Sequence, residues 1–171
     1  MFLELIASFV AGLGAAGVML ALNLATGRRL PRWLMPVAGG VAMIGFAVWS
    51  EYSWATRTAG GLPQGVVEIT RVPESRPWKP WTYLAPQATR LMAADVAGAA
   101  RRQDAPDTRL VTLYFFARWQ PAQSAPVLVD CTAPARADVT DAALADPAAA
   151  SWRALSPDDP LVRTVCDDGA S

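Results

Sequence analysis

Two long stretches without charge open the chain, and they restrict its fold more than any other feature. The first covers the 23 residues that follow Glu4, and the second covers the 18 residues that end at Ser50. Helices over these stretches would measure about 35 and 27 Å, close to the ~30 Å hydrocarbon core of a bilayer. The sequence therefore predicts a transmembrane helical hairpin over residues 1–50, with helices at about 4–26 and 33–50.

A cleaved secretory signal is the alternative interpretation of the first stretch. The start of the chain lacks the basic segment of such signals, its apolar stretch is longer than theirs, and a second stretch follows directly. We therefore expect a true membrane anchor, with the lipid bilayer as a partner. The arginine-rich composition, in which Lys79 is the only lysine, fits a bacterial source.

The charges that flank the two stretches predict their orientation. The segment between them carries Arg28, Arg29 and Arg32, whereas the opposite ends carry acidic residues. Because basic loops next to membrane helices stay in the cytoplasm, both termini and residues 51–171 are expected on the outer side. In a bacterial cell this corresponds to a multi-pass protein of the inner membrane whose larger part lies in the periplasm.

Small residues recur in both stretches, and the first contains the spacing GxGxxG. A dinucleotide-binding loop with this spacing must follow a strand and open an amphipathic helix. Here the glycines lie inside an apolar helix, where small side chains let two helices approach closely. The residues expected at such contacts are Gly12, Ala16, Gly17, Gly39 and Gly40. Two alternatives stay open, namely contact within the hairpin and docking onto another membrane protein.

The composition excludes several classes of function. The chain has no histidine, and its 15 basic and 15 acidic residues cancel. The first fact excludes histidine-based acid–base catalysis and histidine-ligated zinc or haem, and the second gives no indication of nucleic-acid binding. Asp95 and Asp130 are candidates for a general acid and base, but nothing in the sequence brings them together. We therefore expect a non-enzymatic protein without a cofactor or a bound metal.

The chain after the hairpin is expected to fold outside the membrane. Residues 51–64 contain glycine, proline and small polar side chains, which are typical of a linker. Residues 65–171 predict a small α+β domain with an antiparallel sheet. Alternating and β-branched side chains predict strands at 65–72, 109–119 and 127–131. Apolar spacing and capping residues predict helices at 86–102, 140–144, 148–155 and 156–166.

Cys131 and Cys166 are the only cysteines, and both follow the hairpin. An even number of cysteines in an oxidising compartment favours a disulfide. The chain has no CxxC pair for thiol exchange, and two thiolates without histidine make a poor metal site. The sequence therefore predicts a structural bridge between these two residues.

A proline-rich segment is the most distinctive stretch outside the hairpin. Three prolines within nine residues, at positions 73, 77 and 80, forbid regular structure. Aromatic side chains on such a stiff loop lose little entropy on docking, so they make good binding anchors. The expected partner-binding residues are Trp78, Lys79, Trp81 and Tyr83. The alternative is that the tryptophans fold back onto the core or rest on lipid headgroups.

Together these features predict a non-enzymatic accessory or interaction subunit of a larger integral membrane protein complex. A respiratory complex is one example of such a host. The alternative is a membrane-anchored periplasmic sensor or small-ligand-binding protein, with a pocket between the sheet and a helix. An enzyme that uses the two aspartates is the third hypothesis.

Overall fold

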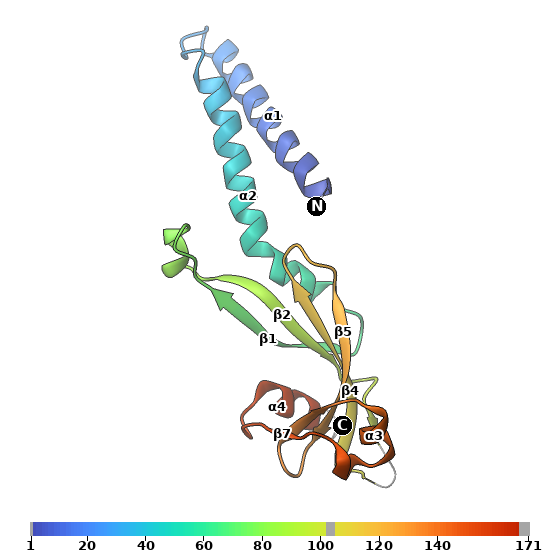
Figure 1. Ribbon diagram of the computed structural model, residues 1–171. Coiled ribbons are helices and arrows are strands. Elements are labelled where there is room, and N and C mark those ends of the chain that lie inside the picture. The colour runs from blue at the N-terminus through green and yellow to red at the C-terminus, as the bar shows by residue number, and fades with distance from the viewer. Residues whose placement is uncertain (1, 102–104, 168–171) are drawn as a thin grey trace. The chain divides into compact units, whose positions relative to one another are not determined.

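The computed structural model describes residues 2–101 and 105–167. The chain divides into two compact units, Met1–Trp54 and Ala55–Ser171. The first unit is helical, and the second is built around a β-sheet (Figure 1).

Two long apolar helices form the first unit. They are α1 (Phe2–Ala25) and the larger part of α2 (Leu34–Gly60), and they pack against each other. Both are long and apolar enough to cross a membrane, by length and composition. Only 6% of the most apolar window of each helix is buried within the described protein, so most of this apolar surface is left for the surroundings to cover.

Polar contacts close both ends of the helical pair. At the turn, the side-chain oxygen of Asn23 accepts a hydrogen bond from the backbone N–H of Leu30 at 3.0 Å. Gly27 in this turn has a φ of 69°, a left-handed conformation that glycine adopts without strain. At the other end, the Ser50 hydroxyl donates to a carboxylate oxygen of Glu4 at 3.0 Å.

The second helix is longer than the sequence analysis predicts. The linker expected at 51–64 is helical as far as Gly60, and only the residues from 61 to 65 connect α2 to the sheet. No glycine or proline interrupts the chain between 46 and 59, so the helix continues until Gly60 and Gly61 end it. The N–H of Gly61 still donates to the carbonyl of Arg57 at 3.1 Å.

An antiparallel sheet forms the framework of the second unit, which confirms the predicted α+β fold class. Its strands are β1 (Val66–Glu74), β2 (Gln87–Asp95), β3 (Ala100–Arg101), β4 (Thr108–Ala117), β5 (Gln123–Asp130), β6 (Ala135–Asp138) and β7 (Arg153–Ala154). They pair in the order β1-β2-β4-β5-β6-β7, with β3 also paired to β4. Every described strand pair is antiparallel, so the sheet is a curled meander.

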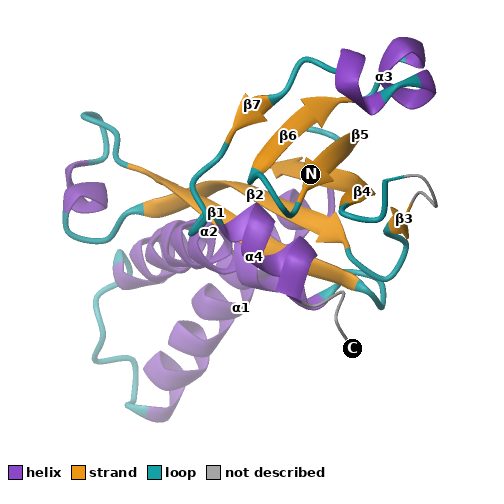
Figure 2. Ribbon diagram, turned by 90° about the horizontal axis from the view of Figure 1, so that it is seen from below, coloured by secondary structure: helices purple, strands orange, loops and turns teal. Residues whose placement is uncertain are grey.

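Two apolar clusters cover the two faces of this sheet. Helix α4 (Pro160–Asp167) lies over one face (Figure 2). Its Leu161 and Val165 belong to the same buried cluster as Val111 and Leu113 of β4. The opposite face carries a smaller cluster that includes Leu128, Ala137 and Ala143, the last from helix α3 (Asp141–Ala145). Strand β4 is apolar on both sides, but its apolar residues are buried only on the side under α4, at Val111 and Leu113, whereas Leu110 on the opposite side is half-buried.

The predicted elements agree with the structure in part. The strands expected at 65–72, 109–119 and 127–131 correspond to β1, β4 and β5, although β5 begins earlier. The helix expected at 140–144 corresponds to α3, whose N-cap Thr140 accepts from the N–H of Ala143. The last helix begins at Pro160 rather than near 157, because Asp159 and not Ser156 caps the N–H of Leu161.

The helix predicted at 86–102 is wrong. Residues Gln87–Asp95 form β2, which pairs with β1 on one side and β4 on the other. The apolar spacing in this segment resembles a helical stripe, but adjacent residues Ala93 and Ala94 are both fully buried. Burial on both faces of an inner strand gives continuous apolar runs that periodicity cannot distinguish from a helix. The helix expected at 148–155 is likewise absent, replaced by a 3₁₀ turn at Pro147–Ala149 and by β7.

Candidate functional site

The connection between β1 and β2 is an ordered loop, here called the aromatic loop and defined as residues 75–86. Pro77, Pro80 and Pro86 fix the backbone at three points, and Pro80–Tyr83 forms a 3₁₀ turn. Backbone bonds from the N–H of Lys79 to the Arg76 carbonyl, at 2.9 Å, and along the 3₁₀ turn hold its path. The prediction that three prolines forbid regular structure over residues 73–81 is therefore wrong at both ends of the segment, because Pro73 lies within β1 and Pro80 begins the 3₁₀ turn.

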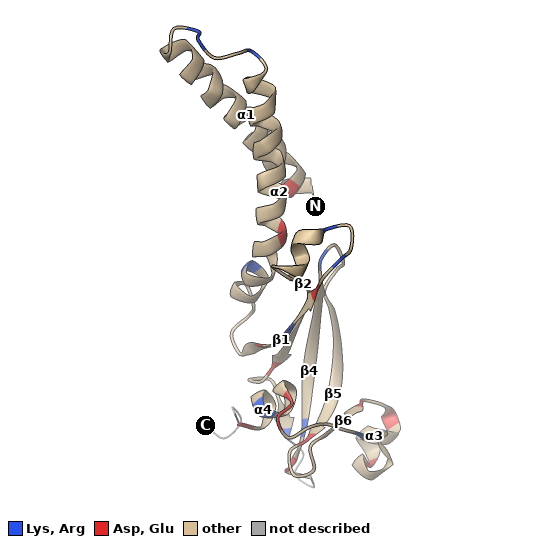
Figure 3. Cartoon of the chain, turned by 90° about the vertical axis from the view of Figure 1, so that its left-hand side faces the viewer, with Lys and Arg blue, Asp and Glu red and all other residues tan. Residues whose placement is uncertain are grey.

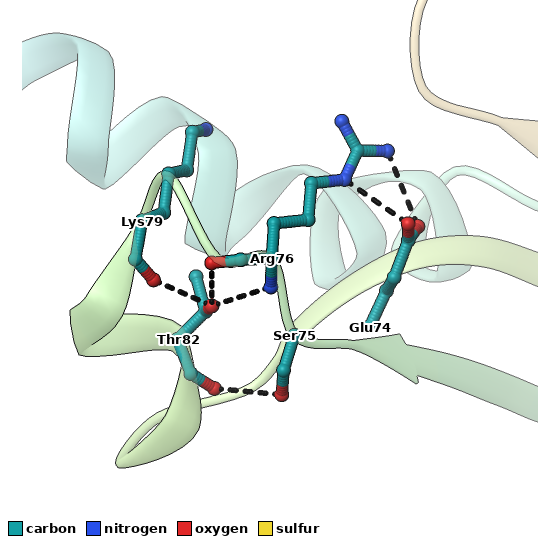
Figure 4. A network of polar contacts seen from close by, with 5 residues as sticks. All are labelled: Glu74, Ser75, Arg76, Lys79 and Thr82. Carbon is teal, nitrogen blue, oxygen red and sulfur yellow. Dashed lines mark hydrogen bonds and ion pairs between the residues drawn. The ribbon is translucent and has the colours of Figure 1, made fainter.

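A buried threonine organises the aromatic loop from inside (Figure 4). The Thr82 side chain is fully buried, with an exposed fraction of 0%. Its hydroxyl accepts from the N–H of Arg76 at 2.9 Å and donates to the carbonyl of Lys79 at 2.7 Å. The Ser75 hydroxyl donates to the Thr82 carbonyl at 3.0 Å. These bonds tie the two sides of the loop together.

An ion pair fixes the base of the aromatic loop. Two guanidinium nitrogens of Arg76 donate to the two carboxylate oxygens of Glu74, at 3.1 and 3.2 Å. The pKa of Glu74 is lowered, first by the hydrogen bond from Arg76 and then by one from Thr89. The same guanidinium carbon lies 5.6 Å from the centre of the Trp78 ring, within the range of a cation–π contact.

The large side chains of the aromatic loop are held outward. The exposed fractions are 68% for Trp78, 47% for Trp81, 63% for Tyr83 and 92% for Leu84. The structure therefore does not place the tryptophans as a lid on the core. Such a group of exposed aromatic side chains on a rigid support is uncommon on a monomer and typically marks a contact surface.

A second turn lies at the same end of the sheet. Residues 118–122 join β4 to β5, and because neighbouring strands are antiparallel, this turn and the aromatic loop both leave the end where Arg90 pairs with Ala117. Trp119 in this turn is 54% exposed, and the Arg118 guanidinium lies 4.3 Å from its ring centre. We call this end of the sheet, with both loops, the aromatic end.

The aromatic end is also basic. Residues 68–90 and 118–122 together hold five basic and two acidic side chains, a net charge of +3, and the two acidic side chains, Glu68 and Glu74, pair with Arg71 and Arg76. Residues 130–167 instead hold three basic and seven acidic side chains, a net charge of −4. The charges of the second unit are therefore segregated, with acidic side chains gathered around α3 (Figure 3).

Two open hollows flank the sheet near its aromatic end. One, of about 510 Å³, lies on the face that α4 partly covers and is lined by Val72, Arg90 and Phe115, among others. The other, of about 440 Å³, lies between the end of α2 and the opposite face, next to Tyr114 and Phe116. Both are open to solvent, unlike the enclosed apolar pockets that bury most small ligands.

The predicted disulfide is present at the other end of the sheet. Cys131, directly after β5, is bonded to Cys166 of α4, and their Cα atoms are 5.8 Å apart. The Arg109 guanidinium donates to the carbonyl of Val165, one of the last carbonyls of α4. Burial lowers the pKa of Arg109, and repulsion from Arg101 adds to this. The bond and the arginine together hold α4 on the sheet.

The two aspartates considered for catalysis are engaged in turns. A carboxylate oxygen of Asp95 accepts from the N–H of Gly98 at 2.8 Å. A carboxylate oxygen of Asp130 accepts from the N–H groups of Thr132 and Ala133, at 2.8 and 3.1 Å. Short polar side chains commonly stabilise turns in this way, which gives both residues a structural role.

The small residues of the hairpin divide into two groups. A Cβ atom on Gly39 would lie 3.1 Å from the carbonyl oxygen of Gly12 and 3.8 Å from the Cβ of Ala16. These three residues therefore lie where α1 and α2 are in contact. Gly17 and Gly40 belong to the other group, because a Cβ at either position would meet no atom within 4 Å.

Sequence reasoning identified the exposed aromatic side chains but missed Thr82, the Glu74–Arg76 pair and the hollow beside Phe115. Hydrophobic periodicity carries no signal for a polar hub inside a loop, whereas the opposite charges of Glu74 and Arg76, two residues apart, were visible in the sequence.

Comparison of the chain with protein-family models, curated proteins and solved structures finds no match. The geometry of the site therefore carries the functional argument.

Proposed function

We propose that this protein is an accessory subunit of an integral membrane protein complex, anchored in the bacterial inner membrane by its hairpin. Its sheet unit lies in the periplasm and contacts the partner through the aromatic loop, with Trp78, Lys79, Trp81 and Tyr83 at the contact. The observation that carries this proposal is the combination of strongly exposed aromatic side chains with a buried polar hub, Thr82, that fixes their support.

The physical argument is one of pre-organisation. A flexible loop would lose conformational entropy on binding, whereas this one is already fixed by three prolines and the bonds to Thr82. Tryptophan and tyrosine bury large areas with few rotatable bonds, so they dominate binding energy at protein interfaces. A surface of this kind serves binding better than catalysis.

The membrane location rests on three further observations. Both α1 and α2 have membrane-like length and apolar composition, and the arginines of the segment between them favour a cytoplasmic turn. The disulfide is consistent with an oxidising compartment for the sheet unit. Gly17 and Gly40, which are not used within the hairpin, leave room for a close approach by a partner helix.

A native-state interaction assay tests the proposal. The full chain is extracted from its own membranes in a mild detergent, separated under native conditions and analysed by mass spectrometry. We expect a stoichiometric membrane protein partner, whose recovery falls at least about tenfold in the Trp78→Ala/Trp81→Ala variant. Leu144→Ala, at an apolar position of α3 that is 43% exposed, is the matched control and should retain the partner.

Stability measurements separate a contact role from a structural one. The double alanine variant should unfold at the same temperature as the wild-type chain, because the two side chains are largely exposed. A lone species of monomer size, or a clear loss of stability in the variant, would contradict the proposal.

Protease accessibility tests the compartment independently. Protease added to spheroplasts should digest the sheet unit, and both cysteines should resist thiol labelling until they are reduced. Protection of this unit in intact spheroplasts would refute the periplasmic assignment.

A further inference from the structure

The hollow beside Phe115 continues the face on which α4 lies. Along β4, alternate residues Val111, Leu113 and Phe115 point to the same side of the sheet. Helix α4 covers the first two with Leu161 and Val165, and it leaves Phe115 39% exposed. The apolar face of the sheet therefore extends beyond the helix that covers it.

The floor of this hollow is an apolar groove. Met92 pairs with Phe115 across β2 and β4, and it belongs to both the core under α4 and the groove. Val72, which is 46% exposed, and Ala117 continue the floor towards the aromatic end. The groove thus begins where the core ends and has a volume of about 510 Å³.

The rim of the groove is basic and polar. Arg90, Gln120 and Gln123 line it, and Arg90 stands directly beside Val72 and Ala117 in the register of the sheet. The aromatic end, counted over residues 68–90 and 118–122, carries a net charge of +3. Charge complementarity therefore favours an acidic occupant with apolar side chains.

The chain itself shows what this sheet face accommodates. Helix α4 is a short segment with buried Leu161, Val162 and Val165, and it is preceded by Asp158 and Asp159. It is held by apolar contacts and by an arginine of β4 that donates to its C-terminal end. A second segment of this kind would lie next to α4 and cover the groove. Arg90 would then contact that segment as Arg109 contacts α4.

We propose that the groove between Val72 and Phe115 binds a short, acidic, amphipathic segment of the partner protein. This inference rests on the proposed function and names the chemistry of the contact. Phe115 and Met92 receive the apolar side chains of that segment, and Arg90 pairs with its carboxylates. The aromatic loop then lies along the same interface.

Site-specific photo-crosslinking tests this proposal in the full-length chain within its native membranes. The photoreactive residue p-benzoyl-phenylalanine replaces Phe115, and a control chain carries it at Leu144, which is similarly exposed but lies on α3. Disulfide formation and tryptophan fluorescence verify folding of both chains. Cross-linked peptides are then identified by mass spectrometry.

The proposal expects a protein cross-link from position 115 whose attached peptide is acidic and apolar at helical spacing. Arg90→Glu should lower the yield about five- to tenfold, because attraction becomes repulsion. Arg153→Glu, an exposed charge reversal on β7, should leave it unchanged. Cross-links to lipid, to a second copy of the chain, or to a basic peptide would each overturn the proposal, as would the absence of any cross-link.

Failure of this inference is distinguishable from failure of the proposed function. A complex that depends on Trp78 and Trp81 but never cross-links through position 115 rejects the groove and leaves the accessory role intact. The absence of any complex rejects both.

Discussion

Replacing Thr82 by valine should loosen the aromatic loop without changing its shape or apolar surface. Valine has nearly the same volume but cannot accept the hydrogen bond from the N–H of Arg76, which is 2.9 Å long in the structure. The carbonyl of Lys79 also loses a donor, yet it still accepts from the backbone N–H of residue 82 at 2.9 Å. The expected cost is therefore that of one unsatisfied donor, about 1–3 kcal/mol.

Hydrogen–deuterium exchange on the full chain measures this cost where it arises. A loss of about 1–3 kcal/mol corresponds to about 5- to 150-fold faster exchange in the peptide that covers Glu74–Ala85. Thr82→Ser keeps the hydroxyl and should exchange at nearly the wild-type rate. If valine and serine give the same exchange as threonine, the hydroxyl network does not order the loop, and the argument from pre-organisation fails.

Three further predictions follow from other parts of the structure. Cys131→Ser opens a bridge across 35 residues and should cost about 3–4 kcal/mol by loop entropy, measured by denaturant unfolding of the non-reduced chain. The pKa of Glu74 is lowered below its ordinary 4.5, so its ion pair stabilises the loop above pH 4.5, and this stabilisation is lost as the pH falls through the lowered pKa. Glu74→Gln should therefore abolish this pH dependence of hydrogen–deuterium exchange in the loop. Gly39→Ala, which places a methyl group 3.1 Å from the Gly12 carbonyl, should destabilise the hairpin by about 1–3 kcal/mol in detergent thermal unfolding, whereas Gly40→Ala should not.

The sequence predicts the fold most reliably in segments most of whose side chains lie in the same kind of environment. The two long helices were predicted from the uncharged composition of their segments, and strand β4 was predicted from its alternating and β-branched side chains. The structure contains all three elements. Strand β2 was missed because its residues, such as Leu91, Met92 and Ala93, have high helix propensity, whereas β4 is rich in aromatic and β-branched side chains. The extension of α2 to Gly60 was missed because small polar residues after Ser50 resemble a linker, although none of them breaks a helix.

The candidate site could also be predicted from the sequence only in part. Prolines and tryptophans are visible in the sequence, so the aromatic loop could be located there. The role of Thr82 could not, because it depends on the backbone path that brings Arg76 and Lys79 around one hydroxyl. The groove beside Phe115 depends on where α4 stops, which is a property of the packed domain rather than of any local segment.

The meander order of the sheet has a consequence for how the domain is assembled. Apart from β3, each described strand pairs with the strands before and after it in the chain, so successive hairpins can form in chain order. The cover of Val111 and Leu113 belongs to α4, which follows every described strand in the chain. The bond between Cys131 and Cys166 therefore joins the sheet to a helix that is made after the strands, and until that helix docks, Val111 and Leu113 lack its cover.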